Sequence, residues 1–185
     1  NPAMLYNRHL GYRGNFTNDL KVNVKKATDL FESVNKVKEI LKTNENLQAK
    51  VVYKFFKTKS ENNDLIIYDS NSENEISRFT FGRQTDKDML SLSDYVHPVT
   101  SAKDDYVCMF VSTYGPDIRE LAEKYQSKGE FLISHIIQSL ALETAEASAE
   151  FIHKKIREMW GIKDSPDITN QDIFKAKYIG KRYSF

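Results

Sequence analysis

The spacing of hydrophobic residues changes along the chain, and each spacing predicts a different kind of element. Between residues 19 and 42, apolar side chains recur at helical intervals, which is typical of an amphipathic helix. Between residues 49 and 112, β-branched and aromatic residues dominate short segments that favour strands. From residue 130 to residue 160 the helical spacing returns without any Gly or Pro, so we expect one long helix there.

These segments together predict an α+β fold. We expect strands at about residues 49–56, 65–68, 76–82 and 106–112, the first two forming a hairpin. The last strand is apolar at consecutive positions, which is typical of a central strand buried on both faces. Short helices are expected at about 117–125 and 169–178, and residues 1–16 should form an irregular arm. The long helix should bury a stripe made of Ile133, Ile137, Ala141, Ala145, Ala149, Ile152 and Ile156.

Composition and charge narrow the kind of protein. The 185 residues suffice for one substantial domain, and 40% hydrophobic residues can form a real core. Lys and Arg number 27 against 26 Asp and Glu, so the net charge of +1 argues against a nucleic-acid partner. No apolar run approaches the ~20 residues of a membrane span, and Asn1–Ala3 does not begin a signal peptide. Cys108 is the single cysteine, which excludes an internal disulfide, and we expect a cytoplasmic protein.

One face of the long helix carries a row of polar side chains, which we name the charged ridge: Glu143, Glu146, Glu150, His153 and Arg157. Small residues around it would let another segment approach closely, and a carboxylate beneath that segment would be partly desolvated and would need a cation. The alternative is a solvated, salt-bridged face on which Glu150 pairs with Lys154. From the pattern alone the solvated face is the commoner arrangement.

Other chemical motifs are weak. The four histidines share no metal-ligand spacing, and the one Glu-x-x-His, formed by Glu150 and His153, lacks the second copy that a carboxylate metal site needs. We therefore expect no metal site. No phosphate loop or nucleophile elbow is present, so we expect no catalytic residues in this chain. Cys108 lies in an apolar strand and is expected to be a buried small hydrophobe.

Several stretches together resemble the activation domain of cobalamin-dependent methionine synthase, an S-adenosylmethionine-binding module. The longest runs from Ala141 to Gly161, and the others are Leu92–Val96, Leu121–Tyr125, Tyr178–Phe185 and Asn1–Gly11. Together they span nearly the whole chain, so residues 1–185 are identified as one activation domain. The resemblance implies a single C-shaped domain with a twisted antiparallel sheet and flanking helices.

The resemblance also implies a function. The module would bring S-adenosylmethionine to cob(II)alamin for reductive methylation during methionine biosynthesis, as part of the methyltransferase 5-methyltetrahydrofolate–homocysteine S-methyltransferase. Its partners would be the cobalamin-binding domain of the same enzyme, which holds most of the cobalamin, and flavodoxin or another reductase. Neither nucleic acid nor membrane is implied. The alternative is a non-catalytic docking domain that binds a corrinoid protein or flavodoxin without S-adenosylmethionine.

Ligand-binding residues transfer only in part. Arg182 matches the family arginine that binds the methionine carboxylate, and Glu146 matches a family glutamate near the ligand. A family acid in the N-terminal arm falls on Asn1, and a second glutamate falls on Ala176, so both positions depart from the family. A fully exposed Glu146 would contradict its role.

Truncation is the largest departure from the family. The family continues after the arginine into a loop that contacts the ligand, whereas this chain ends at Phe185 and begins with Asn rather than Met. We therefore expect a fragment that is incomplete at its C-terminus, binds S-adenosylmethionine weakly or not at all, and is inactive alone.

Overall fold

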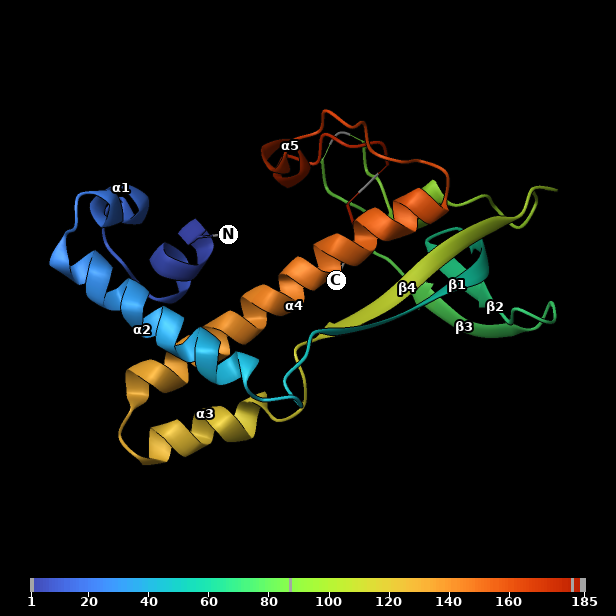
Figure 1. Ribbon diagram of the computed structural model, residues 1–185. Coiled ribbons are helices and arrows are strands. Elements are labelled where there is room, and N and C mark those ends of the chain that lie inside the picture. The colour runs from blue at the N-terminus through green and yellow to red at the C-terminus, as the bar shows by residue number, and fades with distance from the viewer. Residues whose placement is uncertain (1, 87, 181, 184–185) are drawn as a thin grey trace. The chain divides into compact units, whose positions relative to one another are not determined.

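The computed structural model describes residues 2–86, 88–180, 182 and 183, without the side chain of Phe174. The expected α+β fold is confirmed, with helices, an open sheet and one long helix (Figure 1). The chain divides into two compact units. The first contains Asn1–Val51 and Ser112–Phe185, and the second contains Val52–Val111.

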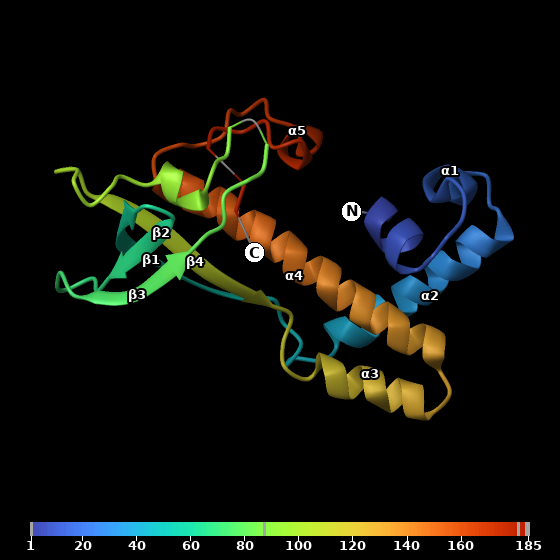
Figure 2. The ribbon, with the colours of Figure 1, turned by 180° about the vertical axis from the view of Figure 1, so that it is seen from behind.

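The first unit is helical. Its elements are the π-helix η1 (Ala3–His9), α1 (Phe16–Lys21), α2 (Lys25–Lys42), α3 (Ile118–Ser127), α4 (Phe131–Met159) and α5 (Asn170–Phe174). Helices α2 and α3 and the π-helix η1 all contact α4, which runs diagonally across the views in Figures 1 and 2. Fully buried aliphatic residues from α2 and α4 form the centre of this core: Val34, Val37, Ile136 and Ile137.

Helix α4 has 29 residues and confirms the predicted long helix. It ends where Gly161 adopts a φ of +83°. The amide of Gly161 donates to the carbonyl of Glu158, and that of Ile162 donates to the carbonyl of Arg157, which is the Schellman pattern of helix termination. Its predicted stripe is confirmed in part, since Ile137, Ala141, Ile152 and Ile156 are buried while Ile133, Ala145 and Ala149 are half-buried.

Two helix predictions near the N-terminus were wrong. The single helix expected at 19–42 is two helices, because Asn23 adopts a φ of +56° and ends α1. The amide of Val24 bonds the carbonyl of Asp19, and that of Asn23 bonds the carbonyl of Leu20, so asparagine takes the place of the usual glycine. The arm expected to be irregular is helical over Ala3–His9, where Leu5 and Tyr6 are buried in the core.

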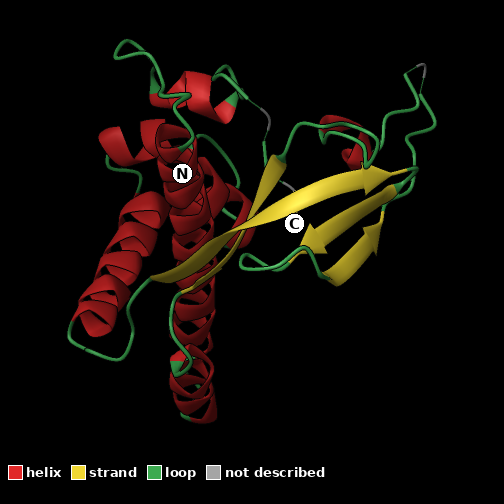
Figure 3. Ribbon diagram, turned by 90° about the vertical axis from the view of Figure 1, so that its right-hand side faces the viewer, coloured by secondary structure: helices red, strands yellow, loops and turns green. Residues whose placement is uncertain are grey.

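The second unit holds most of the sheet, whose strands are β1 (Lys50–Glu61), β2 (Asp64–Tyr68), β3 (Glu75–Thr80) and β4 (Asp105–Thr113) (Figure 3). The strand order is β3-β2-β1-β4, and the 3₁₀-helix η2 (Leu92–Tyr95) lies in the connection before β4. The predicted hairpin is confirmed: β1 and β2 are antiparallel, with Glu61 opposite Asp64 across a turn in which Asn62 has a φ of +54°.

The prediction of a central, doubly buried strand at 106–112 was wrong. Strand β4 stands at one end of the described sheet, and Tyr106 and Val111 are 49% and 69% exposed. Apolar residues on both faces therefore do not mark the middle of a sheet here. Cys108, which we expected to be buried, is half-buried, and burial raises the pKa of its thiol.

Candidate functional site

The charged ridge of α4 contacts both the N-terminal arm and the end of the chain. The Glu143 carboxylate oxygen Oε1 accepts a hydrogen bond from His9 Nε2 at 3.0 Å. Glu150 accepts hydrogen bonds from Arg182 Nη2 and the Tyr183 hydroxyl, each at 3.3 Å. Segments distant in sequence therefore contact the ridge at Glu143 and Glu150, and Glu150 pairs with Arg182 and Tyr183 rather than with Lys154, the partner expected on a solvated face.

Arg157 forms the buried centre of the C-terminal half of the ridge. Its side chain is 4% exposed, and its Nη2 donates to both carboxylate oxygens of Asp164, at 2.7 and 2.6 Å. Its guanidinium lies 3.9 Å from the centre of the Tyr178 ring. Its Nε is buried and has no hydrogen-bond partner among the described residues. A buried guanidinium needs a counter-charge, and Asp164 provides it. The Arg157–Asp164 pair therefore fixes the segment after α4 onto the helix.

His153 lies between Arg157 and Glu150 on the same ridge. Arg157 Nη1 lies 3.0 Å from His153 Nδ1. A guanidinium can only donate, so Nδ1 must accept, which places the proton of a neutral ring on Nε2. The edge-on rings of Tyr178 and Tyr183 lie 5.4 and 5.3 Å from the imidazole. His153 thus contacts both aromatic residues of the segment Tyr178–Tyr183, which we name the tail.

Gly180 gives the tail a backbone conformation that side chains of L-residues rarely adopt. It adopts a φ of +102°, and a Cβ at this position would lie 3.6 Å from Arg157 Cδ and 3.4 Å from Ile162 Cδ1. Any L-residue would be strained in that conformation. The segment after α4 folds back beside the C-terminal half of the helix in both Figure 1 and Figure 2.

Arg182 itself remains accessible. Its side chain is 59% exposed, whereas that of its partner Glu150 is 27% exposed. The neighbouring Tyr183 hydroxyl and the Glu150 carboxylate raise the pKa of Arg182, so it is cationic at any pH of interest. The site therefore presents a fixed, solvent-facing guanidinium, which is the group that binds carboxylates best.

The other residues singled out from the sequence are Glu146, Asn1 and Ala176, and the two that the structure describes, Glu146 and Ala176, are both exposed. Glu146, one turn from both Glu143 and Glu150, is exposed, and it is Glu150 that accepts the hydrogen bond from Arg182. The expected desolvation of Glu146 is therefore wrong, while a contact with ligand stays a prediction. Asn1 lies outside the described residues. Ala176 is exposed, with a φ of +52°.

The approach of a second segment to the small residues of α4 is also observed. The hydroxyl of Ser112, at the end of β4, donates to the carbonyl of Ala145 at 3.0 Å. On the N-terminal side, His135 Nε2 lies 2.8 Å from the carbonyl of His9. Alanine and serine side chains in the middle of α4 thus leave room for neighbours, as the sequence indicated.

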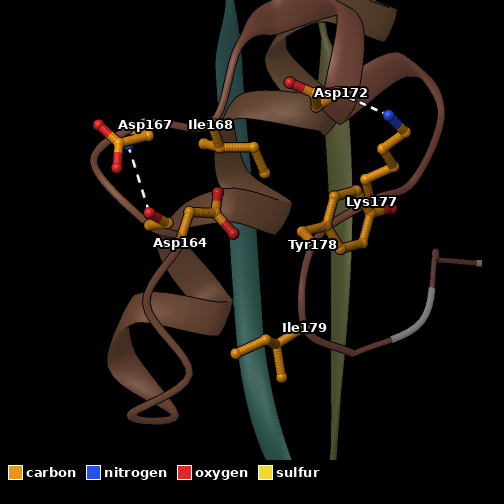
Figure 4. A pocket seen from close by; sticks show the side chains of 8 residues that line it. Asp164, Asp167, Ile168, Asp172, Lys177, Tyr178 and Ile179 are labelled. Carbon is orange, nitrogen blue, oxygen red and sulfur yellow. Dashed lines mark hydrogen bonds and ion pairs between the residues drawn. The ribbon is translucent and has the colours of Figure 1, made fainter.

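A pocket of about 320 Å³ lies between the segment after α4 and the tail (Figure 4). Three aspartates line it, but two already have partners: Asp164 binds Arg157, and Asp172 binds Thr169 and Lys177. Those hydrogen bonds hold the pocket wall together. Within the described residues, no group of three or more His, Cys, Asp or Glu side chains is placed to hold a metal ion.

Sequence reasoning missed the network around Arg157. It placed His153 and Arg157 on the ridge but assigned them no role, and it did not single out Asp164 or Tyr178. The only signal was the step of four between a histidine and an arginine beside small residues, which does not reveal burial.

The fold and the ridge define an α+β binding module whose accessible arginine suits an anionic group. The family model described as vitamin B12 dependent methionine synthase, activation domain, matches residues 7–185, and the chain belongs to this family. The chain is also similar to a solved structure described as the MetH reactivation domain bound to AdoHcy, with a TM-score of 0.82 and 25% sequence identity. The match covers 95% of this chain and 57% of that chain, so our chain spans a little over half of its length.

No helix in the described part of the chain has both the length and the apolar character to cross a membrane.

Proposed function

We propose that this chain binds S-adenosylmethionine as the reactivation module of a cobalamin-dependent methionine synthase. The observation that carries the proposal is Arg182, which is accessible to solvent yet fixed on α4 by Glu150. The methionine part of S-adenosylmethionine ends in a carboxylate, which a guanidinium can bind through two parallel N–H bonds. Membership of the activation-domain family and the AdoHcy bound to the similar MetH domain support the same class of ligand.

A ridge carboxylate could also offset the positive charge of the ligand. S-adenosylmethionine also carries an ammonium and a sulfonium, and an acid near them would offset this charge. Glu143 and Glu150 are already engaged by His9 and Arg182. Glu146 therefore remains our proposed partner for the cationic part of the ligand, and Asn1 our proposed contact from the N-terminal arm.

The wider role is proposed at the level of the whole enzyme. We propose that residues 1–185 form one activation domain of a cytoplasmic methyltransferase and act beside its cobalamin-binding domain, with flavodoxin or another reductase as electron donor. When bound, S-adenosylmethionine supplies the methyl group that returns cobalamin to its methylated state. The residues of this chain would bind that ligand and orient it, and the methyltransferase chemistry would belong to other parts of the enzyme.

The proposal is tested by calorimetric titration of S-adenosylmethionine into this chain and into a form extended beyond Phe185, since the resemblance places further ligand contacts there. We expect binding by the extended form and weaker or undetectable binding by the shorter one. No binding by either form would contradict the proposal. Binding of flavodoxin or a corrinoid protein by such a form would then favour the docking-domain alternative.

A further inference from the structure

The tail is attached to α4 at three successive turns of the ridge. Arg157 holds Tyr178 against its guanidinium, His153 contacts the rings of Tyr178 and Tyr183, and Glu150 binds Arg182 and Tyr183. Steps of three and four residues place all three side chains on one face of the helix. The position of Arg182 is thus set by a continuous series of contacts.

The contacts at the two ends of this series differ in burial. The Arg157–Asp164 pair is almost wholly buried, with side chains 4% and 3% exposed, so it anchors the protein chain itself. The Glu150–Arg182 pair is at the surface, and one carboxylate oxygen, Oε1, accepts both the guanidinium and the Tyr183 hydroxyl. The charged end of the series faces solvent and any ligand in it.

Arg182 keeps donors that Glu150 does not use. A guanidinium has five N–H donors in a rigid fork, and the bond to Glu150 comes from Nη2. A second carboxylate can therefore bind the same side chain without displacing the first. Fixing the fork beforehand lowers the entropy lost when the ligand binds, since a long arginine side chain is otherwise mobile.

We propose that Glu150 is a positioning residue that holds the Arg182 guanidinium for the carboxylate of the ligand. This inference rests on the proposed function and adds to it the residue that orients the ligand-binding arginine. Glu150 acts through Arg182 and through the Tyr183 hydroxyl beside it.

The test compares two ligands on Glu150→Gln. S-adenosylmethionine has the carboxylate, and decarboxylated S-adenosylmethionine keeps the adenosine, sulfonium and ammonium groups without it. Glutamine has nearly the same shape but no charge, and its amide hydrogens oppose the two donors. We expect the affinity for S-adenosylmethionine to fall about tenfold, the size of one charge-assisted hydrogen bond, and that for the decarboxylated ligand to change less than twofold. Titrations use whichever form of the chain binds S-adenosylmethionine.

The matched control is Glu158→Gln. Glu158 lies on the same helix, and its carboxylate pairs with Lys155 at 2.9 Å instead of with any tail residue that the structure describes. The Glu158→Gln variant should bind S-adenosylmethionine and decarboxylated S-adenosylmethionine with unchanged affinities. Hydrogen exchange of the backbone amides of the tail provides a second measurement, and it should accelerate in Glu150→Gln and not in Glu158→Gln.

The outcomes separate this inference from the proposed function. If Glu150→Gln weakens both ligands equally, or neither, Glu150 is a structural contact or none, and the inference fails while the function stands. If the unaltered protein binds neither ligand, the proposed function fails and this inference fails with it.

Discussion

At the scale of single residues, the buried Arg157–Asp164 pair should matter most for stability. Asp164→Asn would leave the guanidinium buried without a counter-charge, and breaking such a pair costs about 3 kcal/mol or more. We expect the free energy of unfolding to fall by about that amount in urea denaturation. Asp167→Asn, an exposed substitution three residues away, should change it by less than about 0.5 kcal/mol. Equal stability of the two variants would show that Asp164 is not needed to compensate Arg157.

The partners of the ridge residues could not be predicted from helical spacing. Lys154 was the partner expected for Glu150 on a solvated face because it lies one turn away, but the structure pairs Glu150 with Arg182, 32 residues further along. Spacing along a helix shows which residues share a face and says nothing about what covers that face. The two ends of the proposed ligand site, Glu146 and Arg182, came from the family resemblance.

At the scale of elements, composition sufficed where one physical rule dominates. A stretch of 31 residues without Gly or Pro gave α4 to within a residue at each end. The prediction failed where one residue overrides the pattern, as Asn23 does between α1 and α2. The edge position of β4 was missed because its neighbours are set by pairing with a distant strand, which hydrophobicity does not encode.

Helix α5 offers an element-scale prediction about pH. The Thr169 hydroxyl, and after it Lys177, donates to Asp172 and lowers the pKa of that carboxyl from 3.8 to about 2. The unfolded chain therefore binds the proton more readily, so ionised Asp172 stabilises α5 above pH 4 and this contribution is lost as the pH falls toward 2. We expect the Asp172 carboxyl to titrate near pH 2 by NMR, with amide protection of α5 falling over the same range.

The corresponding control removes the titrating group. Asp172→Asn should abolish the loss of α5 protection between pH 4 and pH 2, because an amide does not titrate there. Retention of the same pH dependence in this variant would assign the effect to another carboxyl.

At the scale of the whole molecule, the described ridge and tail residues belong to one compact unit. Glu143, Glu150, Arg157 and Arg182 all lie in the unit formed by Asn1–Val51 and Ser112–Phe185, which is helical apart from short strand ends. Its two sequence segments meet on α4, where His9 and Arg182 contact the ridge two turns apart. A ligand bound there would join the beginning and the end of the chain, so its effect should extend to the stability of this unit.

Thermal unfolding in the presence of ligand, measured on the form of the chain that binds S-adenosylmethionine, therefore tests the proposed function. At a concentration 100 times its dissociation constant, a ligand that binds only the folded state stabilises it by about 2.7 kcal/mol, which raises the melting temperature by roughly 5–10 °C for a chain of this size.

Arg182→Ala should weaken binding of S-adenosylmethionine roughly 10- to 150-fold, because it removes a charge-assisted contact with the carboxylate. At the same ligand concentration its thermal shift should then be about half that of the unaltered protein or less. Arg119→Ala serves as the control, since that arginine is 88% exposed on α3 and pairs with Glu123. Equal shifts for Arg182→Ala and the unaltered protein would mean that the ligand binds elsewhere.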